Sequence, residues 1–282
     1  MKTCLHILPA LLALILCSCQ GNIQPPQQSQ MVVEGWIEDG GHPVVILTST
    51  VPVSEESAPI DTLEQYLIRW ARVAVSDGEK TVVLSGKYTD DYFPPYIYTT
   101  AEMRGESGKT YTLTVDYEGR HATASTTIPC SVALDSIYAC KRNGDADTTY
   151  SVHAVFRHDA AKQRYFKMFT RRSGQSNQFY SSFIGLHDCT ILDNPADILV
   201  NSGMSLTNYA KYKSYFLSGE IVSVKLCTLD ETSYLFWYDW EESETFASNA
   251  FMPATSNIRG NVQGALGYWC GYGQSVKTIQ VE

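Results

Sequence analysis

The sequence carries little positive charge and shows no cluster of it. Of 282 residues, 21 are Lys or Arg and 30 are Asp or Glu, which gives a formal net charge of -9. An acidic surface repels the phosphate backbone of nucleic acids. We therefore expect no nucleic-acid partner.

The short motifs of several enzyme classes are also missing. The sequence has no Gly-x-Ser-x-Gly nucleophile elbow, no HExxH zinc motif, no Asp-x-Asp-x-Asn-Gly calcium loop and no CxxC pair. A catalytic triad assembles in space, so spacing alone does not exclude one. We nevertheless expect no enzymatic activity, no catalytic residues, no metal and no cofactor.

Long apolar runs are absent except at the N-terminus. Lys2 precedes a nearly unbroken apolar stretch over residues 5–16, which is shorter than the roughly 20 residues that a spanning helix needs. The tetrapeptide LCSC follows at 16–19 and resembles a lipobox, with a thiol to be alkylated and small side chains before the cut. The rival Cys17 is preceded by bulky residues. We predict a lipoprotein signal peptide over residues 1–18 and a lipid anchor in the membrane at Cys19.

The segment after the lipobox is polar and uncharged. Residues 20–30 read QGNIQPPQQSQ, a composition that cannot form a core. We predict that residues 19–30 are a flexible tether. Gln20 stands where an Asp would favour retention at the inner membrane, so the expected location is the outer membrane.

Five cysteines remain once the signal peptide and Cys19 are set aside: Cys130, Cys140, Cys189, Cys227 and Cys270. Five is an odd number, so at least one thiol is expected to be free. A Cys130–Cys140 bridge across a hairpin-like connection is one alternative. The other is that the cysteines are reduced and buried as small apolar side chains, and the pairing stays open.

The mature chain is predicted to be mainly β. Residues 31–38 alternate apolar and polar side chains, residues 110–117 do so strictly, and turn-forming clusters follow both segments. Strands about ten residues apart, with turns between them, are typical of an antiparallel sandwich. We predict an immunoglobulin-like antiparallel β-sandwich over residues 31–129.

Residues 130–282 are predicted to form a second β-rich domain with one notable α-helix. The polar stretch 173–204 is expected to be long loops, and two closing strands are expected at 265–273 and 276–281. The helix is expected near residues 229–246. Thr228, followed three residues later by Glu231, fits a capping box.

Aromatic residues gather in two places. The loop 88–98 holds Tyr92, Phe93 and Tyr96 beside two prolines, and we single out these three as candidate contacts for a ligand or a partner protein. Core packing is the alternative. The second set is Trp237, Tyr238, Trp240, Tyr268 and Trp269. We expect most of these five side chains to pack in the core.

Two groups of polar residues are expected to be structural. Asp239, Glu241, Glu242 and Glu244 are spread around the axis of the predicted helix, which favours a solvated face over a calcium or sugar site. His153 and His158 lie five residues apart, so a strand points them to opposite faces and a shared metal is not expected.

An ordered set of segments carries a family resemblance. The set is VVEGWI, ARVAVSDG, GKTYTLTVDYEG, TTIP running into LDSI, RYFKMF, SYLFWYDW and IRGNVQGALGYW. Together they resemble the lipoprotein family known as domain of unknown function 4249, over nearly the whole mature chain. Members are often encoded beside TonB-dependent outer-membrane transporters, so the resemblance implies an accessory or surface role. It brings no catalytic residues with it.

We therefore expect a non-enzymatic accessory or binding component of a TonB-dependent uptake system. The alternatives are a stand-alone glycan- or peptide-capturing lipoprotein and, third, a cell-envelope hydrolase. Surface-exported lipoproteins of such bacteria often carry acidic residues soon after the cysteine, and residues 20–30 have none. The periplasmic and surface faces of the outer membrane both stay open.

Overall fold

The computed structural model describes residues 29–51, 64–142, 148–159, 161–175, 177–204, 212–247 and 258–282. Within these ranges strands dominate, and the α-helix among them is α2 (Glu231–Ala247). The mainly β fold with one notable helix is confirmed. The strands are β1 (Met31–Glu38), β2 (Val44–Ser49), β3 (Arg72–Ser76), β4 (Thr81–Val83), β5 (Ser85–Tyr88), β6 (Tyr96–Thr99), β7 (Thr110–Tyr117), β8 (Arg120–Thr127), β9 (Leu134–Lys141), β10 (Thr149–Phe156), β11 (Tyr165–Arg172), β12 (Tyr180–Asp188), β13 (Ala196–Val200), β14 (Phe216–Leu217), β15 (Ile221–Leu229) and β16 (Leu266–Gln280).

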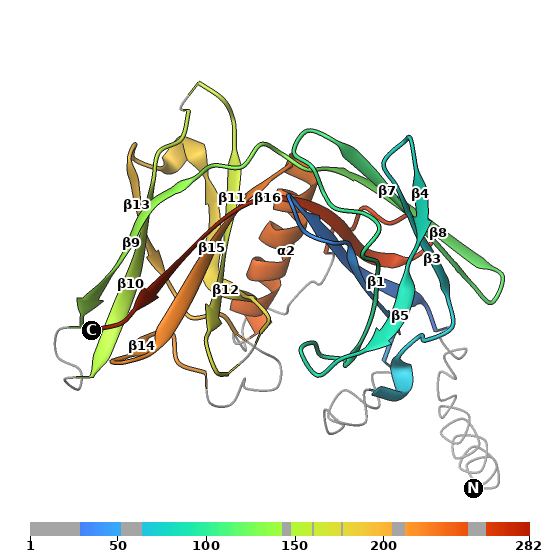
Figure 1. Ribbon diagram of the computed structural model, residues 1–282, viewed down its shortest axis with the longest axis horizontal. Coiled ribbons are helices and arrows are strands. Elements are labelled where there is room, and N and C mark those ends of the chain that lie inside the picture. Colours follow the sequence, from blue (N-terminus) through green and yellow to red (C-terminus); the bar gives the residue numbers. More distant parts are fainter. Residues whose placement is uncertain are drawn as a thin grey trace, which may run out of the picture.

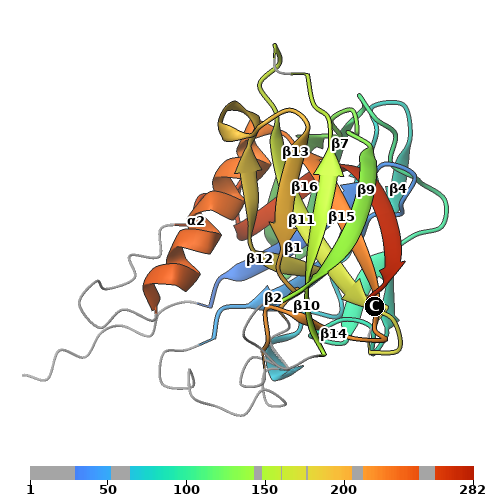
Figure 2. The same ribbon diagram turned by 90° about the vertical axis from the view of Figure 1, so that its left-hand side faces the viewer.

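One eight-stranded sheet runs through both halves of the molecule, in the order β12-β11-β15-β16-β1-β2-β6-β5. Two four-stranded sheets pack against its two ends. Figure 1 shows the halves side by side, with β16 passing from one to the other and α2 between them. Figure 2 shows that α2 lies along one side of the strands, next to β12.

The N-terminal half is a β-sandwich. The sheet β4-β3-β7-β8 faces the β1, β2, β6 and β5 end of the large sheet, and every pair of named strands within this half is antiparallel. Alternate side chains of β1 and β7 fill the space between the layers, because successive residues of a strand point to opposite faces. Val33, Val73 and Val115 are completely buried there.

The C-terminal half is a second sandwich, in which β9, β10, β13 and β14 cover β11, β15 and the end of β16. Its core includes the buried rings of Phe156, Phe166 and Phe216. The prediction of long loops over 173–204 was wrong, because β12 and β13 lie in this stretch. Both are edge strands, and an edge strand with few buried positions keeps the polar composition of a loop.

The two closing strands expected near the C-terminus are one strand, β16. Its first part, residues 266–272, pairs in parallel with β1, and its second part, residues 273–280, pairs antiparallel with β15. Trp269 of β16 is completely buried in the N-terminal core. The boundary near residue 129 stays a prediction, but a residue from beyond it completes the N-terminal core.

Helix α2 begins two residues after its predicted start. Asp230 is the N-cap, since its Oδ1 accepts a hydrogen bond of 2.8 Å from the backbone N–H of Ser233. The predicted capping box was wrong: Thr228 belongs to β15, and its hydroxyl accepts a hydrogen bond of 3.2 Å from the backbone N–H of Val132.

None of the helices in the described ranges is long and apolar enough to cross a membrane. Cys19 and the predicted signal peptide lie outside the described residues, as does all of the predicted tether except Ser29 and Gln30. The lipid anchor and the tether therefore stay predictions.

Candidate ligand-binding site

A pocket with a volume of about 400 Å³ opens where the two sandwiches meet. Strands β1, β16, β15 and β11 form its floor, which is the same face of the eight-stranded sheet throughout. Its walls come from α2, from the start of β12, from Met204 and from two loop segments, 92–93 and 177–179. Ligand pockets in proteins have volumes of about 300–1,000 Å³ and gather at junctions of this kind, so this is the candidate site.

The polar face of β1 supplies part of the floor. Glu34, Trp36 and Glu38 point into the pocket, while Val33 and Ile37 between them are completely buried in the N-terminal core. The sequence predicts this alternation. It does not show that the polar face is covered by α2 and by the loop at Tyr92 instead of facing open water.

Aromatic rings make up most of the wall. The rings of Trp36 and Tyr92 lie 5.9 Å apart between centroids, and those of Phe236 and Tyr268 lie 4.1 Å apart. Trp240 reaches the pocket from the next turn of α2. Such aromatic walls suit a ligand that has apolar groups or a positively charged group.

One buried ion pair closes a side of the pocket. The ammonium group of Lys225 pairs with the carboxylate of Glu38. The same ammonium lies 5.3 Å from the ring centroid of Phe169 and 4.6 Å from that of Phe179. Lys225 is thus held by a carboxylate and by two aromatic faces together.

Glu34 differs from Glu38 in its partners. It accepts a hydrogen bond of 3.0 Å from the hydroxyl of Tyr268, its neighbour in register on β16. Burial raises the pKa of the Glu34 carboxyl, and the Tyr268 hydrogen bond opposes that rise in part. Among the salt bridges of the described residues, none involves Glu34.

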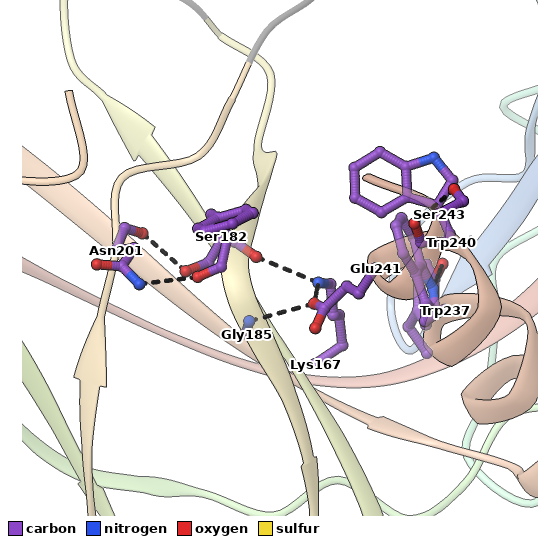
Figure 3. Close-up of polar contacts among 10 residues, drawn as sticks. Lys167, Ser182, Gly185, Asn201, Trp237, Trp240, Glu241 and Ser243 are labelled. Atoms are coloured by element: carbon purple, nitrogen blue, oxygen red, sulfur yellow. Dashed lines mark hydrogen bonds and ion pairs between the residues drawn. The ribbon is translucent and has the colours of Figure 1, made fainter. Parts of the chain in front are cut away.

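A second buried ion pair fixes α2 against the sheet. Lys167 of β11 is completely buried, pairs with Glu241 of α2 and donates a hydrogen bond of 3.2 Å to the carbonyl oxygen of Ser182. The backbone N–H of Gly185 donates to the same carboxylate at 3.2 Å (Figure 3). The Lys167 ammonium lies 4.9 Å from the ring centroid of Trp237. Burial lowers the pKa of Lys167, and Glu241 opposes this shift.

The acidic run of α2 is not the solvated face that the sequence predicts. Glu241 faces the sheet, and Asp239 holds the guanidinium of Arg259 through two hydrogen bonds of 2.6 Å. This pairing lowers the pKa of Asp239. Glu242 is exposed and accepts a hydrogen bond from Tyr238. The side chain of Glu244 lies outside the described residues.

The three candidate contact residues of the sequence analysis do not lie together. Tyr92 and Phe93 line the pocket. Tyr96 begins β6 and packs edge-on against Tyr98 at 5.5 Å, and its hydroxyl donates to the carbonyl oxygen of Arg69 at 3.2 Å. The contact of Tyr92, Phe93 and Tyr96 with a ligand or partner stays a prediction.

Core packing describes only part of the second aromatic set. Trp269 is completely buried and Trp237 nearly so, but Tyr238 is 41% exposed. Trp237, Trp240 and Tyr268 line the pocket. The signal that sequence reasoning missed is the pairing of acidic and aromatic residues on one face of β1, in the segment EGWIE.

The two histidines considered as metal ligands have separate surroundings in the structure. His153 contacts Asp197 at 3.0 Å and stacks on Tyr138, whereas His158 is buried and lies 3.3 Å from the carbonyl oxygen of Asp193. In the part of the chain that the structure describes, no group of three or more His, Cys, Asp or Glu side chains is placed to hold a metal.

The five cysteines of the mature chain are all described and all free. Cys130 and Cys140 are exposed and form no bridge with each other, while Cys189, Cys227 and Cys270 are buried. Burial raises the pKa of the Cys270 thiol to about 12, and that of Cys227 also rises. The thiols of Cys227 and Cys270 are therefore unreactive, and both side chains pack as small apolar groups beneath α2.

Comparison with known proteins gives one family. The sequence model of the family described as "Domain of unknown function (DUF4249)" matches residues 22–278. The match includes nearly all of both sandwiches and every residue of the pocket. No curated protein matches the chain.

Proposed function

This chain belongs to the DUF4249 family, and from that membership and the junction pocket we propose that it is an outer-membrane-anchored lipoprotein that binds without catalysing a reaction. We propose further that it is an accessory or binding component of a TonB-dependent uptake system. The observation that carries the proposal is the aromatic pocket of about 400 Å³ between the two sandwiches.

The chemistry of the pocket supports binding over catalysis. Its charged pair, Lys225 and Glu38, is mutually neutralised, and Glu34 is hydrogen-bonded to Tyr268. The lining residues that the structure describes include no histidine and no cysteine, which are the commonest general base and thiol nucleophile. Rigid aromatic walls suit recognition of a ligand.

The location rests on the lipobox at residues 16–19. A lipid on Cys19 and a polar tether to residue 30 place the folded part close to the membrane surface, within reach of an outer-membrane transporter. Tyr92 and Phe93 belong to one loop in the wall of the pocket. We propose that this loop contacts the transporter.

Co-purification tests the accessory role. The lipidated full chain, extracted in mild detergent, is expected to recover an outer-membrane transporter, and a Tyr92→Ala, Phe93→Ala, Tyr96→Ala triple variant is expected to recover less. Tyr88→Ala is the matched control, because Tyr88 lies in the same region and is 57% exposed. Recovery of no transporter, together with turnover of a peptide, ester or glycan, is the result that favours a hydrolase.

The aromatic walls also favour one alternative, a stand-alone lipoprotein that captures a glycan or peptide. Trp36, Tyr92 and Trp240 offer faces on which a sugar ring or an apolar side chain stacks. Under this alternative the purified chain binds a glycan or peptide with no transporter present. A shift in tryptophan fluorescence on titration measures that binding.

A further inference from the structure

We infer that the junction pocket takes an organic cation, an amine or quaternary ammonium group, with Glu34 as its counter-ion and the aromatic rings as its walls. This inference rests on the proposed binding function and names the class of ligand.

The fold already holds two cations in the same way. Lys225 pairs with Glu38 and lies over the rings of Phe169 and Phe179. On the neighbouring strand β11 the same arrangement recurs with other residues. Lys167 pairs with Glu241 and lies over the Trp237 ring. Each ammonium group receives a carboxylate on one side and an aromatic face on another.

A third carboxylate with aromatic neighbours lies in the same pocket, without a cation. Glu34 shares the lining with the rings of Trp36 and Phe236. Its hydrogen bond in the structure comes from Tyr268, a neutral hydroxyl whose pKa burial raises well above the ordinary value. In the described part of the chain no Lys, Arg or His makes a salt bridge with Glu34. Compared with the two lysine sites, the Glu34 site has the carboxylate and the aromatic rings but no ammonium group.

Charge selects among the classes of ligand. Glu38 and Lys225 cancel, so an ionised Glu34 leaves the described lining with one net negative charge. An anion is repelled. A neutral sugar stacks on the rings and leaves Glu34 without a counter-ion. A cation meets both the carboxylate and the negative faces of the rings, the combination by which aromatic cages hold ammonium groups.

Binding of a cation is coupled to a proton. Tyr268 from β16 contacts Glu34, and the other titratable or charged groups of the pocket lining are Tyr272 from β16, Tyr92 from its loop, Tyr180 from β12 and the Glu38–Lys225 pair. Burial raises the pKa of Glu34 in the empty pocket, and a bound cation lowers it again. A cation therefore displaces a proton, and its affinity rises with pH through the pKa of the empty site.

Two probes of the same shape test the inference. Choline and 3,3-dimethylbutan-1-ol differ by a positive nitrogen in place of a carbon, and both are titrated into the purified full chain by calorimetry. We expect choline to bind at least about tenfold more tightly. Glu34→Gln is expected to remove most of that difference, while Glu102→Gln, at an exposed position, keeps it.

A second variant guards against misfolding of the first. Tyr268→Phe keeps the ring and Glu34 but removes the hydrogen bond that lowers the pKa of Glu34. The rise of choline affinity with pH is therefore expected to move to higher pH. An unchanged pH profile counts against Glu34 as the counter-ion.

The results separate the inference from the proposed function. Equal affinity for the two probes overturns the cation and leaves the pocket as a site for neutral ligands. A Glu34→Gln variant that binds choline as the unaltered chain does overturns Glu34 as the counter-ion. Failure of both probes, with a transporter still recovered by co-purification, overturns the inference and leaves the accessory role standing.

Discussion

Gly35 and Trp269 lie opposite each other on the parallel strands β1 and β16, and a methyl group at Gly35 would stand 2.8 Å from Cε3 of the Trp269 ring. The Trp269 ring therefore occupies space that a side chain at position 35 would need, and only glycine leaves this space open. The indole N–H of Trp269 donates a hydrogen bond of 3.0 Å to the carbonyl oxygen of Tyr111. Through this one side chain, β16 joins the two sheets of the N-terminal sandwich.

Gly35→Ala is expected to reduce the free energy of unfolding by about 1–3 kcal/mol, since the added methyl group overpacks the core. Trp269→Ala leaves a cavity and is expected to cost about 3–5 kcal/mol. Urea unfolding measures both. Trp70→Ala is the control, because Trp70 is 89% exposed. An unchanged urea midpoint for Gly35→Ala contradicts the close approach.

A fragment of residues 29–129 tests the predicted N-terminal domain. It retains the strands of both sheets of the sandwich but lacks Trp269 and the pairing of β1 with β16. We expect it to fold to a β-rich structure that is less stable than the full chain, as measured by circular dichroism and urea unfolding. A fragment that stays unfolded or gains substantial helix counts against a separate domain.

Glu241→Ala is expected to destabilise the protein by about 3–5 kcal/mol, because it leaves the ammonium group of Lys167 buried without its counter-ion. Glu242→Ala, one position along α2, removes an exposed carboxylate that contacts Tyr238 and is expected to change little. The free energies of unfolding of the two variants check this. Equal effects contradict the assignment of the ion pair.

The stability of the protein is expected to fall in mild acid through His187. Burial lowers the pKa of His187 to about 4, from an ordinary value near 6.5. Between these values the unfolded chain binds a proton that the folded chain refuses, so the free energy of unfolding decreases as pH falls from about 6.5 to about 4. Thermal unfolding of His187→Gln is expected to show a flatter pH dependence in this window. An unchanged slope in the His187→Gln variant contradicts this assignment.

Cys19→Ala is expected to release the protein from membranes and to block its processing, because the thiol is the predicted site of acylation. Cys17→Ala is the matched control, since it leaves Cys19 and a small residue before the cut. Membrane fractionation and mass spectrometry of the mature N-terminus measure the outcome. An unmodified N-terminus at any residue other than Cys19 contradicts the anchor.

Local patterns predict much of the fold. The alternation in residues 31–38 and 110–117 correctly identifies β1 and β7, and the helix is placed to within two residues at its start. These features depend on neighbours in sequence. Strands β12 and β13 were missed because edge strands need few buried side chains and their composition is that of loops.

The pocket could be predicted only in part. Of the three candidate contact residues, Tyr92 and Phe93 line it, whereas Tyr96 starts a strand and packs against Tyr98. The alternation in residues 31–38 predicts only that Glu34 lies on the polar face of its strand. That face becomes the floor of a pocket because α2 and distant loops pack over it, and no local pattern contains this packing.

The parallel pairing of β1 with β16 also joins parts of the chain that are far apart in sequence. The hydrogen bond between Glu34 and Tyr268 joins residues 234 positions apart. A contact of such separation forms late, because a long stretch of chain must be ordered before its ends meet. Until then β1 has a free edge on the side away from β2. Pairing of β1 with β16 therefore hides that edge from other unfolded chains and brings the β1 and β16 parts of the pocket floor together.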